Sequence, residues 1–184
     1  MIRLFDFLFS FFGILFLLSL MLVLYFIGLF DTGSPIFKQQ RVGKNKKPFT
    51  LYKFRTMHVK AESVATHLAN VAEITRFGSF LRRSKLDELP QLFNVLCGDM
   101  SLVGPRPNLF NQEELILERD KKGVYSILPG ITGEAQIHKI DMSTPKLLAE
   151  TDAVMIENIS LKKYFYYIIV TVVGKGSGDR VKNN

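Results

Sequence analysis

The sequence contains very little cysteine and histidine. Its single cysteine, Cys97, cannot form an internal disulfide, as is typical of proteins in a reducing cytoplasm. Cys97 lies among apolar positions of a predicted helix and is expected to be a small core residue rather than a nucleophile. The three histidines, at positions 58, 67 and 138, have no ligand-like spacing to one another or to Cys97. A His/Cys zinc site is therefore not expected.

Several recognition patterns are also absent. The chain has no glycine-rich loop of the Walker or Rossmann type, no internal repeat and no recognised nucleic-acid motif. Its net charge of +7 nevertheless indicates an anionic partner, either a nucleic acid or an anionic membrane surface. Because the basic residues follow an apolar run, the membrane is the expected partner and nucleic acid is not.

Charge is missing altogether from residues 7–30, which are dominated by Leu and Phe. As a helix this run would extend roughly 36 Å, enough to cross a hydrocarbon core of about 30 Å. It is long for a signal peptide, and no small-residue cleavage site follows it. The run predicts a membrane helix. Nothing in it forces a break, so the residues alone favour a straight span and leave a helix that turns back open.

Basic residues gather directly after this run. The positive-inside rule therefore places the bulk of the protein on the cytoplasmic side, given Lys38, Arg41, Lys44, Lys46 and Lys47. The expected organisation is a membrane helix over residues 1–33, a cytoplasmic catalytic domain over 34–173 and a flexible tail over 174–184.

Residues 35–57 predict a β-hairpin, with its turn at 43–46. Alternation along the second strand puts Lys53 and Arg55 on one face, about 7 Å apart, where two cations could bracket a diphosphate. The alternative is a solvated edge strand.

Residues 84–107 hold the predicted reaction centre. Ser84 and Asp87 resemble a capping box, and Pro90 fits the first turn of a helix, so the adjacent acids Asp87 and Glu88 are expected at a helix start. There the helix dipole favours negative charge, and one acid could attack while the other holds a metal. Acids in a first turn also commonly do no more than satisfy the dipole. One face of this helix is expected to be buried, formed by Leu89, Leu92, Phe93 and Leu96.

Basic residues flank this centre on both sides. Arg82 precedes the acids and could reach the same anion or simply face solvent or lipid, and the stiff turn Pro105-Arg106-Pro107 follows. Further along, residues 112–122 predict a solvated amphipathic helix, and 134–138 a short strand. Another helix starts at Pro145 and includes Asp152, and a final aromatic helical stripe over 161–173 is too short to span a membrane.

Taken together, these features resemble the bacterial sugar transferases, the monotopic phosphoglycosyl transferases. The matching segments cover nearly the whole chain in order: residues 3–6 (RLFD), 52–57 (YKFRTM), 86–96 (LDELPQLFNVL), 98–107 (GDMSLVGPRP) and 129–133 (PGITG). Asp152 matches the Asp of the family's Asp-x-x-Tyr-x-x-Asn segment, with Met155 in place of Tyr. Leu18-Ser19 stands where the family commonly has Ser-Pro.

The resemblance implies an α+β fold. It would combine an N-terminal membrane helix that turns back to the cytoplasmic face, a small β-hairpin or sheet, and amphipathic helices at the membrane interface. It also implies transfer of a phospho-sugar from a UDP-sugar to undecaprenyl phosphate, releasing UMP, at the cytoplasmic face of the bacterial plasma membrane. This would be the first membrane step of a glycan pathway; the sugar is left open, and so is a homodimer formed through the anchor.

The resemblance further implies roles for individual residues. Asp87 would be the nucleophile that carries a covalent phospho-sugar, and Glu88, with Asp87, would hold Mg²⁺. The phosphates or the lipid acceptor would be handled by Lys53, Arg55, Arg82, Pro105, Arg106, Pro107 and Asp152. The alternative function is a non-catalytic, membrane-associated basic scaffold or adaptor for anionic lipids.

Overall fold

The computed structural model describes residues 1–61 and 71–173; the predicted tail over 174–184 lies outside them. Helices, 3₁₀ turns (η) and short strands follow one another in this order: α1 (Ile2–Thr32), β1 (Ile36–Val42), η1 (Lys44–Lys46), β2 (Pro48–Phe54), η3 (Val71–Glu73), α2 (Arg76–Ser84), η4 (Leu86–Glu88), α3 (Gln91–Cys97), β3 (Ser101–Val103), α4 (Glu113–Lys121), η5 (Val124–Ser126), β4 (Gly130–Thr132), α5 (Glu134–Ile137), α6 (Pro145–Glu157) and α7 (Leu161–Val172). The α+β class is confirmed.

Two small sheets organise the domain. β1 and β2 form the predicted hairpin, antiparallel with Phe37 opposite Lys53, whereas β3 and β4 pair in parallel with Ser101 opposite Gly130. The hairpin turn is the 3₁₀ turn η1, in which Asn45 takes a left-handed conformation with φ 54°. β2 ends at Phe54, three residues before the predicted strand end, and Met57 makes only an isolated bridge to Ile74.

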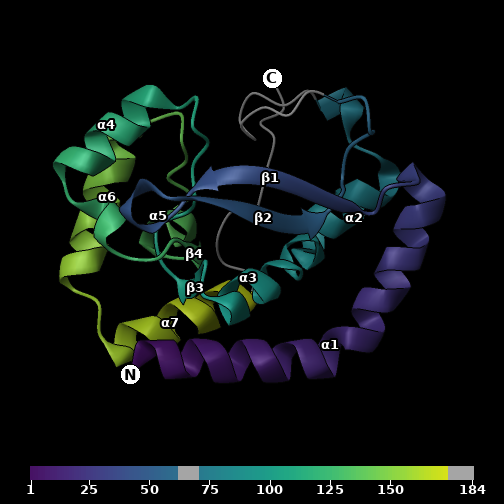
Figure 1. Cartoon of the computed structure of the whole chain (residues 1–184), viewed down its shortest axis with the longest axis horizontal. Coiled ribbons are helices and arrows are strands. Elements are labelled where there is room, and N and C mark those ends of the chain that lie inside the picture. Colours follow the sequence, from purple (N-terminus) through teal and green to yellow (C-terminus); the bar gives the residue numbers. More distant parts are fainter. Residues whose placement is uncertain (62–70, 174–184) are drawn as a thin grey trace.

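Helix α1 is continuous but bent. In Figure 1 it runs along the bottom of the molecule and then turns up the right side. Its N-terminal part packs on α7, where the rings of Phe5 and Phe165 meet edge to face at 5.2 Å. Its C-terminal part contributes Met21 and Leu24 to a cluster with Phe54 of β2. Both parts of the bent helix thus contact one domain, and the structure does not show the straight span that the apolar run favours.

Both ends of α1 are also fixed by polar contacts. Near its start, buried Asp6 accepts hydrogen bonds from the backbone N–H of Leu102 at 2.9 Å and from the hydroxyls of Ser101 at 3.0 Å and Tyr164 at 2.8 Å. Near its end, Thr75 donates a hydrogen bond to Asp31 at 2.7 Å. The same domain therefore holds the helix at its two ends.

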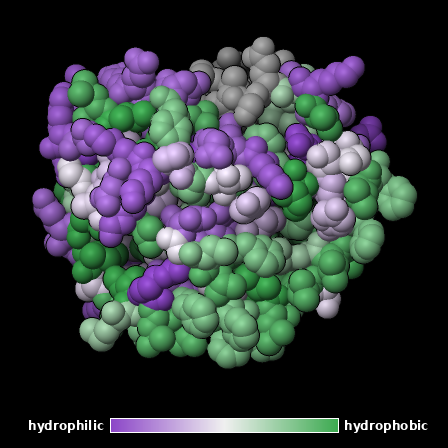
Figure 2. Space-filling view, viewed as in Figure 1, coloured by the Kyte–Doolittle hydropathy of each residue, from purple (hydrophilic) through white to green (hydrophobic). Residues whose placement is uncertain are grey.

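Most of α1 is nevertheless uncovered. Among the described residues it is the one helix long and apolar enough to cross a membrane, and 17% of its most apolar window is buried, far too little for the core helix of a soluble domain. Figure 2 shows hydrophobic surface along the lower edge and the right side, where α1 lies, and hydrophilic surface at the upper left. Exposed Phe93 of α3 and Ile169 of α7 add further apolar surface.

Several local predictions were wrong. Ser84 ends α2 instead of capping α3, because its hydroxyl donates back to the carbonyl of Phe80 at 2.8 Å. The predicted strand over 134–138 is the helix α5, and Cys97 is exposed rather than in the core.

The apolar stripe of α3 does not form its buried face. The buried residues of this helix are Gln91, Asn94 and Val95, whereas Phe93 is 40% exposed. Asn94 is buried because it completes the hairpin edge: its amide donates to Thr50 O at 2.7 Å and accepts from Tyr52 N–H at 3.1 Å. The stripe instead faces α1, where Leu92 lies against Gly13.

Candidate active site

An ion pair forms the centre of the candidate site. Nη2 of Arg106 lies 2.9 Å from Oε1 of Glu88, with 25% of the Arg106 side chain exposed and 9% of that of Glu88. Asp87, beside Glu88, is 2% exposed. A largely desolvated carboxylate–guanidinium pair is stronger and better defined than a surface pair, so Arg106 has a fixed place next to the two acids.

The local backbone explains where the two acids lie. Lys85 is left-handed, with φ 58°, and so ends α2 and starts the 3₁₀ turn η4 that holds Asp87 and Glu88. Leu89 and Pro90 keep right-handed helical angles and lead into α3. The acids therefore occupy a separate tight turn ahead of α3 instead of the first turn of one longer helix. Pro90 fits there because its missing N–H leaves no helical bond unmade.

The turn that carries Arg106 is held at consecutive backbone carbonyls. Five of them, from residue 104 to residue 108, accept hydrogen bonds from four other elements: from Gln136 Nε2 at 3.4 Å, Gly130 N at 2.9 Å, Arg119 Nη1 at 2.8 Å, Arg41 Nη1 at 3.2 Å and Val42 N at 2.9 Å. Prolines at 105 and 107 restrict the same turn further. The backbone on either side of Arg106 is thus fixed by tertiary contacts.

Asp152 is connected to this turn through Arg119. Its Oδ2 accepts hydrogen bonds from Arg119 Nη2 at 2.7 Å and Arg119 Nε at 3.0 Å, and both side chains are at least 98% buried. Burial raises the pKa of the Asp152 carboxyl, an effect that the positive charge of Arg119 opposes. Its predicted contact with phosphate stays a prediction, whereas its contact with Arg119 is direct.

The remaining predicted cations lie along β2 and α2. Lys53 Nζ and Arg55 Cζ lie 5.7 and 5.4 Å from the centre of the same Phe37 ring, so the two side chains share one face as predicted. Arg55 also donates to Ser34 O at 2.7 Å, and desolvation lowers the pKa of its guanidinium. Arg82 Nε donates to the hydroxyl of Thr56 at 2.8 Å. Arg55 thus ties the residue after β2 to the connection between α1 and β1, and Arg82 ties α2 to Thr56. The phosphate contacts predicted for Arg55 and Arg82 stay predictions.

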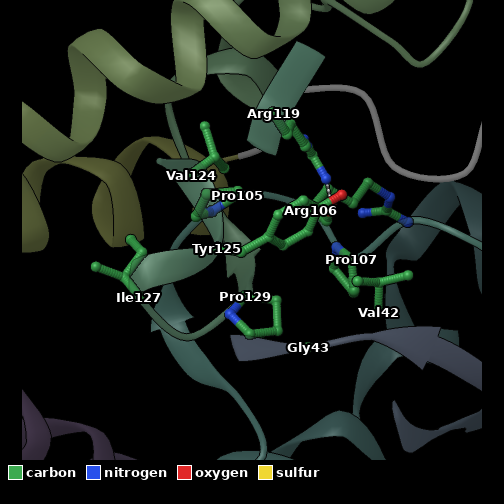
Figure 3. Close-up of a pocket in the computed structure, with 10 residues that line it drawn as sticks. All are labelled: Val42, Gly43, Pro105, Arg106, Pro107, Arg119, Val124, Tyr125, Ile127 and Pro129. Carbon is green, nitrogen blue, oxygen red and sulfur yellow. Dashed lines mark hydrogen bonds between the residues drawn. The ribbon is translucent and has the colours of Figure 1, made fainter. Parts of the chain in front are cut away.

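A small pocket opens beside the same turn. Figure 3 shows Pro105, Arg106 and Pro107 in its wall, with Tyr125 projecting toward its centre and a hydrogen bond from Arg119 to the Arg106 backbone. Its other lining residues are Val42, Gly43, Arg119, Val124, Ile127 and Pro129. The turn therefore borders both the acid pair and a mostly apolar hollow.

The residues that hold the turn do not stand out in the sequence. Charged residues surround Arg119 and predict a solvated helix face, yet its side chain is buried. The available signal was its spacing of four from Leu115, since both residues are buried on one face of α4. The sequence places Arg41 among the basic residues after the apolar run, yet it is 6% exposed and donates to Pro107 O.

The fold and the site define a class: a small α+β domain with a buried carboxylate–arginine centre, attached to a long apolar helix that it holds at both ends. Comparison with known families is more specific. The model of the bacterial sugar transferase family matches residues 1–175, and the chain belongs to this family.

Three curated relatives show how far the similarity extends. The uncharacterised sugar transferase EpsL of Bacillus subtilis is 44% identical over 70% of this chain and 63% of its own length. The UDP-glucose:undecaprenyl-phosphate glucose-1-phosphate transferase of Xanthomonas campestris is 36% identical over 77% of this chain and 30% of its own length. The UDP-N-acetylgalactosamine-undecaprenyl-phosphate N-acetylgalactosaminephosphotransferase of Aeromonas hydrophila is 37% identical over 73% of this chain and 34% of its own length. The chain thus spans less than two thirds of the length of these relatives.

Proposed function

We propose that this protein is a phosphoglycosyl transferase that moves a phospho-sugar from a UDP-sugar to undecaprenyl phosphate and releases UMP. The observation that carries the proposal is the 2.9 Å pair between Glu88 and Arg106 beside buried Asp87, in a domain that holds an apolar helix at both ends. Relatives named for this transfer, with glucose and with N-acetylgalactosamine, support it. Because those two names differ in the sugar, they support the reaction and leave the sugar open.

The proposed reaction proceeds in two balanced steps. The Asp87 carboxylate attacks the phosphorus that carries the sugar, forming an aspartyl phospho-sugar, while the bond to the bridging oxygen breaks and UMP departs with that oxygen. A phosphate oxygen of undecaprenyl phosphate then attacks the same phosphorus and displaces Asp87, giving the lipid diphosphate-linked sugar. Splitting the transfer in this way lets both substrates use one site in turn.

Fixed cations have a defined task in both steps. Negative charge builds up on the phosphoryl oxygens and on the departing UMP, and preorganised guanidinium groups stabilise it without reorganising. Arg106 is the best placed of them because it already pairs with Glu88. Lys53 is buried, and β2 ends next to η4, so it is the second candidate for this role.

The donor set fits Mg²⁺. Among the described residues no group of three or more His, Cys, Asp or Glu side chains comes together, so an all-protein cage is not built there. Mg²⁺ is commonly bound through one or two carboxylates together with substrate phosphates, and Asp87 and Glu88 supply such a pair. When bound, the ion would neutralise charge on the diphosphate. Chelation by EDTA is expected to stop UMP release and added Mg²⁺ to restore it; activity that persists in EDTA would rule the ion out.

The proposed location is the cytoplasmic face of the bacterial plasma membrane, with α1 entering and leaving the same leaflet. Both ends of α1 bond to one domain, through Asp6 and Asp31, and a straight helix across the bilayer would separate them by the thickness of its core, about 30 Å. Exposed aromatic and aliphatic residues of α1 and α7 would lie in the lipid, which brings the site to the surface where a polyprenol phosphate presents its headgroup.

The test measures UMP. The full chain in lipid nanodiscs, with undecaprenyl phosphate and Mg²⁺, is given a panel of UDP-sugars; release of UMP from at least one of them is expected. Asp87→Asn should abolish release, whereas the exposed Asp120→Asn should leave it unchanged. Unchanged turnover in Asp87→Asn would overturn the assigned nucleophile. No UMP from any donor, with vesicle binding that survives loss of both acids, would favour the scaffold alternative.

A further inference from the structure

We propose that Arg119, anchored by Asp152, is a positioning residue that sets Arg106 against Glu88. This inference rests on the proposed function of that site. Arg119 touches neither acid of the centre in any described contact; it acts through the backbone of the turn, where its Nη1 donates to the Arg106 carbonyl at 2.8 Å.

The hydrogen bond from Arg119 goes to the backbone of Arg106, the residue whose side chain pairs with Glu88. Of the five held carbonyls, the one on Arg106 itself is bound by Arg119, and the same Nη1 also reaches Asn108 Oδ1 at 2.9 Å. Tyr125 donates its hydroxyl to that oxygen at 3.0 Å. One guanidinium therefore fixes the turn at its centre and, through Asn108, at its end.

Only an arginine can make these contacts together. Its planar fork directs Nε and Nη2 to Asp152 while Nη1 faces the turn, and a lysine ammonium has no such fixed geometry. Asp152 belongs to α6, and its carboxylate fixes the orientation of the Arg119 guanidinium. The pair thus transmits the position of α6 to the backbone of Arg106.

A contribution to folding stability does not by itself explain why Arg119 and Asp152 are buried as a pair. Burying two charges costs several kcal/mol per ion, and well-packed apolar residues in place of a buried pair are often as stable or more so. Oδ1 of Asp152 has no hydrogen-bond partner among the described residues, which adds to the cost of burial. What the pair supplies beyond packing is a fixed orientation, and small displacements of a charge-stabilising group have large effects on rate.

The test compares Arg119→Lys and Asp152→Asn with a matched control, Lys122→Ala. Lys122 also joins α4 to α6, through Glu150 at 3.7 Å, but at the surface. For both test variants, kcat for UMP release should fall about tenfold or more with the KM for the donor little changed, because the loss is in the transition state. The control should keep the wild-type kcat. Asp152→Asn conserves volume and an acceptor oxygen, so it remains informative if Arg119→Lys does not fold.

A double-mutant cycle separates positioning from general stability. In an Arg106→Ala background, Arg119→Lys should lower kcat for UMP release less than twofold, since the side chain that Arg119 positions is gone. An equal loss of kcat in the Arg106 and Arg106→Ala backgrounds would show that Arg119 does not act through Arg106. The inference fails on that result, while UMP release by the wild type would keep the proposed function intact.

Hydrogen exchange gives a readout that needs no activity. The amides of Val42 and Gly130 donate to the carbonyls of Asn108 and Pro105, so they report on both ends of the turn. They should exchange faster in Arg119→Lys than in Lys122→Ala. Equal exchange in these two variants would overturn the inference even if no donor sugar were found.

Discussion

Arg106 Nη2 and Glu88 Oε1 lie 2.9 Å apart, although the two residues are 18 positions apart in the chain and belong to different elements. The contact joins the proline-bounded turn after β3 to the 3₁₀ turn η4. Because the arginine pairs with Glu88 while Asp87 lies buried beside it, the two adjacent acids have different surroundings. Such a difference is what the separate roles proposed for Asp87 and Glu88 require.

Replacing Arg106 by lysine should preserve charge and lose function. Lysine keeps one positive charge but not the fork that meets a carboxylate and a phosphate in fixed geometry. We expect kcat for UMP release to fall about tenfold or more, the range of a displaced charge-stabilising group. Arg76→Lys, at an exposed position of α2, is the matched control and should behave as wild type. A wild-type rate in Arg106→Lys would mean that charge alone suffices there.

Gly78 should not tolerate alanine. A Cβ at this position would overlap the backbone oxygen of Thr56, two residues after β2, a contact that only movement of α2 away from this backbone can relieve. Overpacking of this kind costs about 1–3 kcal/mol, to be read from chemical unfolding followed by circular dichroism. Ser79→Ala, at the next and exposed position, should change stability little. Equal stability of the two variants would contradict the close packing of α2 on Thr56.

Tyr164 should make the protein sensitive to alkali. Burial, together with its hydrogen bond to Asp6, raises the pKa of the Tyr164 phenol above its ordinary value of 10.0. A phenol whose pKa is raised by folding contributes stability that is present below pH 10 and is lost as the pH rises from there. Tyr164→Phe should therefore lose less stability between pH 9 and 11 than wild type, measured as the thermal midpoint in detergent.

Exposed Tyr166 supplies the control for that experiment. Tyr166→Phe should follow the wild-type pH dependence. If Tyr164→Phe and Tyr166→Phe have the same dependence, ionisation of the buried Tyr164 phenol is not the cause of the alkaline loss of stability.

The bend of α1 predicts that both ends lie on the cytoplasmic side. With Cys97→Ser as background, a cysteine at Ile2 should resist a membrane-impermeant maleimide in intact cells and react after permeabilisation. Lys44→Cys, in the exposed hairpin turn, should behave in the same way and serves as the cytoplasmic reference. Labelling at residue 2 in intact cells, with none at residue 44, would establish a span.

Local patterns in the sequence determined a large part of this protein. The charge-free run at 7–30, the alternation around Lys53 and Arg55, and the short motif with Asp87 and Glu88 each depend on neighbours along the chain. They predicted the apolar helix and the hairpin correctly, whereas the acid pair lies in the separate turn η4 and not at the start of α3. Periodicity reports which side chains share a face, and in these segments the tertiary contacts agree with it.

Tertiary structure decided what those patterns leave open. Nothing in the apolar run specifies a bend; it arises because Phe5 and Leu24 pack on different parts of one domain. The burial of Arg119 and Asn94 could not be predicted either, because a polar residue is buried only where distant groups satisfy its hydrogen bonds. For Arg119 these groups are Asp152 and the Arg106 carbonyl, which only the folded chain brings together.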